Sequence, residues 1–242
     1  MVSAQAFDQL VQRAQQDPAV VGLILTGSRA RPGLATERSD YDVYVITDGD
    51  PAWPSTRSPG LDEEVIPLAE FGRYALPGHP HEWNRYSFTW ARVLLDRQDG
   101  EITRLTRAKG TLRPAEARRL AAGALDAYVN AAYRSAKNHR DARPTEAHLD
   151  AAESLPHLLT TLFALHRRVR PYNKYLGWEL REHPLGGSGW TADRLLPRLR
   201  HVLATGDPPT QRALFADLTA QARTAGLALV LDAWGPDLDL LT

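Results

Sequence analysis

Two carboxylates stand one residue apart in Ser39-Asp40-Tyr41-Asp42-Val43, at the start of a run in which polar and apolar residues alternate. A period of two is typical of a β-strand, so Asp40 and Asp42 should point to the same face. Like charges on an otherwise apolar strand repel each other and lose hydration unless a cation lies between them. Carboxylate oxygens with room left for water and phosphate suit Mg²⁺ in phosphoryl transfer. We therefore predict Asp40 and Asp42 as metal ligands and catalytic residues, with Mg²⁺ as the cofactor.

A Gly-Ser pair ends an earlier apolar run, Val21 to Thr26, which is predicted to be a buried strand. Glycine lets the backbone approach a phosphate closely, and a strand-to-helix turn directs free amides and a hydroxyl at that anion. Gly27 and Ser28 are therefore predicted to bind a nucleotide. Arg29 and Ser39, in the connection that follows, are predicted to meet the same phosphates, with a solvated side chain as the alternative for Arg29.

The pattern of a strand, Gly27-Ser28, eleven residues and then Asp40-Tyr41-Asp42 on a second strand resembles the nucleotidyltransferase signature of the polymerase-β superfamily. Within it, the chain is similar to the small aminoglycoside-type nucleotidyltransferases and their bacterial relatives. The resemblance implies an enzyme that moves a nucleoside monophosphate, expected to be AMP from ATP, to a hydroxyl of a small molecule such as an aminoglycoside-like antibiotic.

The resemblance also implies a third acid, on the strand beside the Asp-x-Asp strand, that helps to bind metal or takes the proton from the attacking hydroxyl. Glu64 is predicted for this catalytic role, because Val65-Ile66 and a helix start follow it in a strand-to-helix segment from Leu61 to Phe71. The alternative is that Asp62, Glu63 and Glu64 form a solvated acidic edge. Other residues that could act as the base are Asp96 and Glu101 near a strand at 92–95, and Asp150 and Glu153 on one face of a helix.

From Leu112 onward the apolar residues follow a helical period. The fold class is therefore predicted to be α+β, with a small mixed β-sheet nucleotidyltransferase domain flanked by helices at 1–110 and an all-α bundle at 111–242. The predicted bundle helices are 114–140, 145–169, 171–182, 191–204 and 208–234, and Pro156 should bend or break the second of them.

Two lysines of the predicted bundle invite a specific role, because the chain otherwise uses arginine for almost all of its positive charge. Lys137 shares a polar helix face with Asn130, Tyr133 and Arg134, and Lys174 follows Arg170-Pro-Tyr-Asn. Both are predicted to contact the nucleotide as point charges. A solvated helix face is the alternative for each.

The amino-acid composition limits the kinds of partner and chemistry that we expect for this protein. Lys+Arg and Asp+Glu balance at 29 each, so no overall positive field recruits nucleic acid or an anionic membrane. The chain has no cysteine, which excludes thiol catalysis and cysteine-ligated metal. No apolar run is long enough to span a membrane and no signal-peptide order is seen, so a cytosolic protein is expected. The expected partners are a nucleoside triphosphate and a small hydroxylated acceptor, for a monomer or a homodimer.

Two other functions fit the same residues. One is nucleotidyl transfer to a protein partner, as in the minimal nucleotidyltransferases that modify a toxin. The other is a non-catalytic protein that keeps the fold in order to bind a nucleotide. Acceptor contacts lie on loops and helix faces that no local pattern reveals, so the sequence leaves this choice open.

Overall fold

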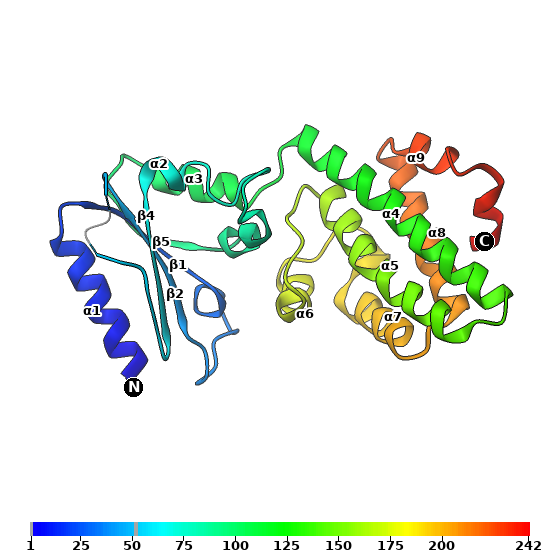
Figure 1. Ribbon diagram of the computed structural model, residues 1–242, viewed down its shortest axis with the longest axis horizontal. Coiled ribbons are helices and arrows are strands. Elements are labelled where there is room, and N and C mark those ends of the chain that lie inside the picture. The colour runs from blue at the N-terminus through cyan, green and yellow to red at the C-terminus, as the bar shows by residue number, and fades with distance from the viewer. Residues whose placement is uncertain (1, 51–52) are drawn as a thin grey trace. The chain divides into compact units, whose positions relative to one another are not determined.

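The computed structural model describes residues 2–50 and 53–242 (Figure 1). Pro51 and Ala52, which belong to a loop predicted from Asp48 to Gly60, lie outside the described residues. The contacts divide the chain into two compact units, Met1–Thr111 and Leu112–Thr242. A mixed sheet with flanking helices in the first unit and helices in the second confirm the predicted α+β fold class.

Unit 1 contains a five-stranded sheet with the order β3-β4-β2-β1-β5. Strands β2 and β4 are parallel, and the other neighbouring pairs are antiparallel. The strands are β1 (Val20–Thr26), β2 (Tyr41–Thr47), β3 (Thr56–Ser58), β4 (Leu61–Pro67) and β5 (Arg92–Asp96).

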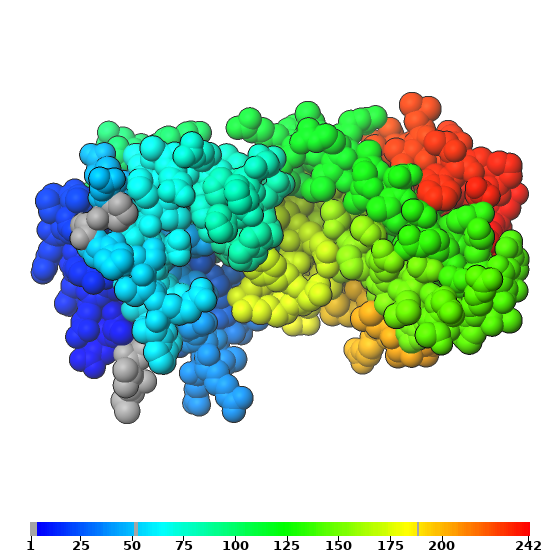
Figure 2. Space-filling view, in the orientation of Figure 1, coloured from blue at the N-terminus to red at the C-terminus, as the bar shows by residue number. Residues whose placement is uncertain are grey.

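Helices cover both faces of this sheet. On one face α1 (Val2–Gln16), at the surface of the unit (Figure 2), packs over Val43, Val45 and their neighbours. The other face is covered by α2 (Leu68–Phe71), α3 (Glu101–Lys109) and the 3₁₀ segment η2 (Glu82–Phe88). Because side chains alternate along a strand, Tyr44 and Ile46 face α2 and α3, and so does Asp42.

Two elements of unit 1 were not predicted. Strand β3 lies inside the predicted loop, and its three residues are exposed and polar, so it carries no apolar pattern. It pairs antiparallel with the edge of β4. Helix α3 buries Thr106 and Lys109 together with Ile102 and Leu105, and two polar residues in the buried stripe conceal its helical period.

Unit 2 is helical and has one hydrophobic core. Helix α5 runs through Pro156, so the helix is not broken there, and the predicted bend stays a prediction. Leu155, Leu158 and Leu159 of this helix are buried in that core, and their burial favours a continuous helix. The predicted fifth helix, 208–234, is two helices, because the first ends at Thr224 and the second begins at Ala228. Gly226 lies between them and has a positive φ of 79°. The helices are α4 (Pro114–Arg140), α5 (Pro144–Leu165), α6 (Asn173–Glu182), α7 (Ala192–Thr205), α8 (Pro208–Thr224) and α9 (Ala228–Asp232), with the 3₁₀ segments η3 (Ser188–Trp190) and η4 (Gly235–Leu241).

Among the residues that the structure describes, no helix is both long enough and apolar enough to cross a membrane.

Candidate functional site

Three aspartates of unit 1 lie together at one end of β2 and β4. Asp40, Asp42 and Asp62 each offer a carboxylate oxygen, and these oxygens are within 4.8 Å of one another. The parallel register places Asp42 directly opposite Asp62, and Asp40 precedes β2 by one residue. Three carboxylates at this spacing repel one another, and a divalent cation would relieve that repulsion. The chemistry of this set of oxygens fits Mg²⁺, although other divalent cations would also be bound by it.

The third acid of this cluster is Asp62, and Glu64 is not among the clustered acids, so its predicted catalytic role stays a prediction. Glu64 lies two residues further along β4, where it is exposed and pairs in register with Tyr44. The sequence could not show this difference, because both acids point to the same face and only the register of β4 on β2 decides which of them reaches Asp42.

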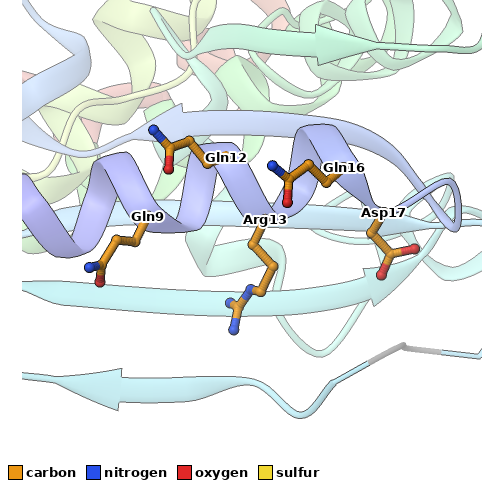
Figure 3. Close-up of a pocket in the computed structure, with 5 residues that line it drawn as sticks. All are labelled: Gln9, Gln12, Arg13, Gln16 and Asp17. Atoms are coloured by element: carbon orange, nitrogen blue, oxygen red, sulfur yellow. The ribbon is translucent and has the colours of Figure 1, made fainter.

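Glu63 faces the opposite side of the sheet and is buried beneath α1. It accepts hydrogen bonds from Arg13 at 2.5 Å and from the Trp53 indole, and the Arg13 guanidinium lies 4.2 Å from the centre of the Trp53 ring. The Arg13 side chain extends from α1 at a hollow of the surface (Figure 3). The residues around this hollow, Gln9, Gln12, Arg13, Gln16 and Asp17, all belong to α1 and the turn after it. This cluster ties α1 to β4 and is separated from the aspartates by the sheet.

The predicted Gly27-Ser28 turn lies directly against Asp42. Thr26 pairs with Asp42 across β1 and β2, and Gly27 follows with φ 66° and ψ −158°. A methyl group at Gly27 would overlap the Asp42 oxygen Oδ2. Glycine is therefore favoured both by the backbone conformation and by the space that the carboxylate fills. Ser28 is the first residue of the short 3₁₀ segment η1 (Ser28–Ala30). The Ser28 amide and hydroxyl therefore come directly after Gly27, the residue that lies against Asp42.

Arg29 and Ser39 are brought together at the start of the Asp40 segment. Arg29 donates from Nε and Nη2 to the Ser39 carbonyl at 3.0 and 2.8 Å, and its guanidinium lies 4.2 Å from the centre of the Tyr41 ring. The Ser39 hydroxyl accepts from the Thr36 amide at 2.9 Å. These contacts fix the backbone that carries Asp40, and a phosphate contact by either residue stays a prediction.

A buried polar network stands behind the acids. Asn84 donates from Nδ2 to the Tyr44 hydroxyl at 2.5 Å and to the Tyr74 hydroxyl at 3.2 Å. Burial, followed by the proximity of Tyr74, raises the pKa of Tyr44, so its phenol stays protonated.

A cation also lies beside the cluster. Arg57 of β3 forms an ion pair with Asp62, with 3.1 Å between Nε and Oδ2, although its side chain is 85% exposed. These two residues lie at a surface hollow of about 250 Å³ that is lined by Ser55, Thr56, Arg57, Asp62, Glu63 and Glu64. An exposed pair of this kind is weak and can open at small cost.

Asp96 and Glu101, the alternative candidates for the base, have local structural partners, and a catalytic role for either stays a prediction. Asp96 pairs in register with Gly22, at the opposite end of β1 from Thr26. Asp96 accepts hydrogen bonds from the Thr103 amide at 3.0 Å and from the Thr103 hydroxyl at 2.7 Å. Burial raises the pKa of Asp96, but its hydrogen bonds lower it by more, so the pKa is lowered overall. Glu101 binds Arg104 at 2.6 Å.

The remaining predicted residues belong to unit 2. Asp150 and Glu153 both accept from Arg134, at 2.9 and 2.6 Å. The ammonium group of Lys137 lies 5.3 Å from the centre of the Tyr133 ring, and that of Lys174 lies 4.8 Å from the centre of the Tyr175 ring. Their proposed roles, as a base for the two acids and as nucleotide contacts for the two lysines, stay predictions.

Comparisons with known proteins give a limited result. No protein-family model matches the sequence, and no curated protein matches it. Among solved structures, a nucleotidyltransferase-like protein from Exiguobacterium sibiricum is similar, with a TM-score of 0.44 and 15% sequence identity over 95% of this chain and 78% of that chain. A likeness at this level carries no information on substrate, metal or activity.

Proposed function

We propose that this protein is a Mg²⁺-dependent nucleotidyltransferase that moves AMP from ATP to a hydroxyl group of a small molecule. The observation that carries the proposal is the contact between two halves of one site. Three carboxylates each offer an oxygen within 4.8 Å of the others, and Gly27 is packed so closely against one of them that a side chain at this position would displace it. The acids supply ligands for a cation, and the turn supplies donors for the anion that this cation accompanies.

In this proposal Asp40, Asp42 and Asp62 hold the divalent ion. When bound, the ion supplies Lewis-acid stabilisation of charge on the phosphate oxygens. The Ser28 amide and hydroxyl bind phosphate oxygens of the triphosphate, and Gly27 lets the backbone come close enough to do so. The chain itself thus orients the triphosphate, and that positioning is the main source of catalysis in phosphoryl transfer.

The transfer forms one bond and breaks one. The acceptor oxygen bonds to the α-phosphorus, and the bond between that phosphorus and the bridging oxygen of the β-phosphate breaks, so pyrophosphate leaves. The hydroxyl proton passes to a carboxylate, for which we propose Asp62, because it belongs to the cluster and its partner Arg57 is exposed and able to move away. An acidic site favours a cationic acceptor, and an aminoglycoside-like antibiotic is the example that we propose to test first.

The test is Mg²⁺-dependent release of pyrophosphate by the full chain, screened with each nucleoside triphosphate against a panel of hydroxylated antibiotics. Asp42→Asn and Asp62→Asn should each lower the rate by about a hundredfold or more, because each removes a ligand charge from the site. Glu64→Gln is the matched control, since Glu64 lies on the same strand and face but outside the cluster.

The outcomes separate the assignments. Near-wild-type rates in both aspartate variants would place the metal site elsewhere. A hundredfold loss in Glu64→Gln with little change in Asp62→Asn would restore Glu64 as the third acid.

A further inference from the structure

Arg31 is a buried cation that the proposed chemistry does not use directly. Its side chain is 2% exposed. Nη1 donates to the Gly27 carbonyl at 2.5 Å, and Nη2 donates to the carbonyls of Thr89 at 2.9 Å and Tyr86 at 3.2 Å. Its guanidinium carbon lies 4.9 Å from the centre of the Tyr86 ring. One guanidinium thus joins the Gly27 turn to a chain segment more than fifty residues away.

The bond to Gly27 fixes a peptide plane. In a trans peptide the carbonyl and the following amide point in opposite directions. Because the Gly27 carbonyl points at Arg31, the Ser28 amide points away from Arg31. On its other side Gly27 lies against the Asp42 carboxylate, which fills the space of a side chain there. The direction of the Ser28 amide therefore follows from the bond between Arg31 and the Gly27 carbonyl.

Arginine suits this connection by the geometry of its side chain. Its planar fork carries several donors at fixed spacing, so one side chain can serve carbonyls on different segments, whereas lysine is a point charge on a flexible stem. Burial of a cation among carbonyls carries a desolvation cost, which the charge-assisted hydrogen bonds to the Gly27, Tyr86 and Thr89 carbonyls offset. The charge itself raises the local positive potential behind a turn that is proposed to bind phosphates.

We propose that Arg31 is the positioning residue of the triphosphate site: it orients the Gly27–Ser28 peptide so that the Ser28 amide is presented to the phosphates. This inference rests on the proposed function and adds to it the residue that sets phosphate affinity without touching the metal. Arg31 should therefore affect triphosphate binding and leave binding of the metal alone unchanged.

Arg85 provides a matched control. It is also a buried arginine of unit 1, 5% exposed, and it donates from Nε to the Lys109 carbonyl at 2.7 Å and from Nη2 to the Thr111 carbonyl at 2.9 Å. Replacement of Arg85 by lysine disturbs a comparable buried guanidinium that does not bind the Gly27 turn. Arg31→Gln is a second test variant, because it leaves no buried charge without its partners.

The experiment uses the full chain and three calorimetric or thermal measurements on each variant. These are the affinity for a non-hydrolysable ATP analogue with Mg²⁺, the affinity for Mn²⁺ alone, and the melting temperature. Arg31→Lys and Arg31→Gln should weaken binding of the analogue by roughly tenfold to a hundredfold, with Mn²⁺ affinity within about threefold of wild type. Arg85→Lys should leave both affinities unchanged, whatever its effect on the melting temperature.

Wild-type affinity for the analogue in both Arg31 variants would overturn the inference. So would a parallel loss of Mn²⁺ affinity, which would show that Arg31 only supports the fold of the whole site. Failure of the proposed transfer looks different, because the unmodified protein would then release no pyrophosphate even where it binds the analogue. Absence of analogue binding to the unmodified protein in the presence of Mg²⁺ would overturn both the proposed function and the inference.

Discussion

At the scale of single residues, the site depends on one close approach. Gly27 and Asp42 come from different strands, and the carboxylate occupies the space that a side chain at position 27 would need. A side chain added at position 27 would therefore displace the acid.

Gly27→Ala should consequently damage both halves of the site. The added methyl overlaps Asp42, and the positive φ of 66° adds strain of about 1 kcal/mol or more. We expect a lower melting temperature and a loss of Mn²⁺ affinity of at least tenfold by calorimetry.

Gly33→Ala is the control for backbone strain. Gly33 has a φ of 74°, and nothing lies within 4 Å of the position that its methyl group would occupy. It should lower the melting temperature in the same way without affecting Mn²⁺ affinity. An equal change in Mn²⁺ affinity in both variants would show that strain, and not contact with Asp42, is the cause.

At the scale of elements, a buried lysine joins two helices of unit 1. Lys109 ends α3 and is fully buried; its Nζ donates to the Phe71 carbonyl at 2.5 Å, at the end of α2, and lies 4.3 Å from the centre of the Phe71 ring. Burial, and then the positive charge of Arg85, lowers the pKa of Lys109 to about 8. The charged form is thus destabilised in the folded chain.

This shift predicts how stability depends on pH. The unfolded chain keeps the proton on this lysine up to its ordinary pKa of 10.5, whereas the folded chain releases it near pH 8. Between these values the unfolded state binds more protons, so the free energy of unfolding rises with pH. Below about pH 8 both states are protonated and the cost of the buried charge is fully present. The full rise corresponds to roughly 3 kcal/mol.

Urea unfolding at several pH values between 7 and 10.5 measures this rise. Lys109→Met should lack the part of the rise that comes from Lys109. Other groups titrate in the same range, and their contribution remains in both proteins. Lys174→Met, which replaces an exposed lysine, should keep the wild-type slope. Identical slopes for wild type and Lys109→Met would show that Lys109 keeps its proton when buried.

At the scale of the whole molecule, the chain has separate hydrophobic cores. Two cores lie on the two faces of the sheet in unit 1, and another fills the helices of unit 2. The three aspartates all belong to unit 1. A bound metal should therefore stabilise one unit only, because a ligand stabilises the structure that holds it.

Hydrogen exchange with and without Mn²⁺ tests this separation. Amides of β2, β4 and the Gly27 turn should exchange more slowly with the metal, and amides of α4 and α5 should not change. Asp42→Asn should remove the protection of the strands. Protection that appears in α4 or α5 and persists in Asp42→Asn would place the metal in unit 2.

The sequence by itself determined the features that depend on neighbours along the chain. The alternation after Asp40 placed two carboxylates on one face, and the apolar run to Thr26 ended in the turn at Gly27. The helical period from Pro114 to Arg140 defined α4 with its observed bounds. Each of these patterns is local, since the period of a strand or helix and its stop signals lie within a few residues.

The tertiary structure decided what depends on segments far apart. Asp62 replaces Glu64 in the cluster because the register of β4 on β2 is fixed by packing of the whole sheet, and both acids satisfy the same pattern along their own strand. Nothing in the sequence distinguishes Arg31 from the other arginines, because its two partners, the Gly27 and Thr89 carbonyls, meet at its guanidinium only in the folded chain. A sequence pattern can assign a side chain to a face, but only long-range pairing determines which side chains meet there.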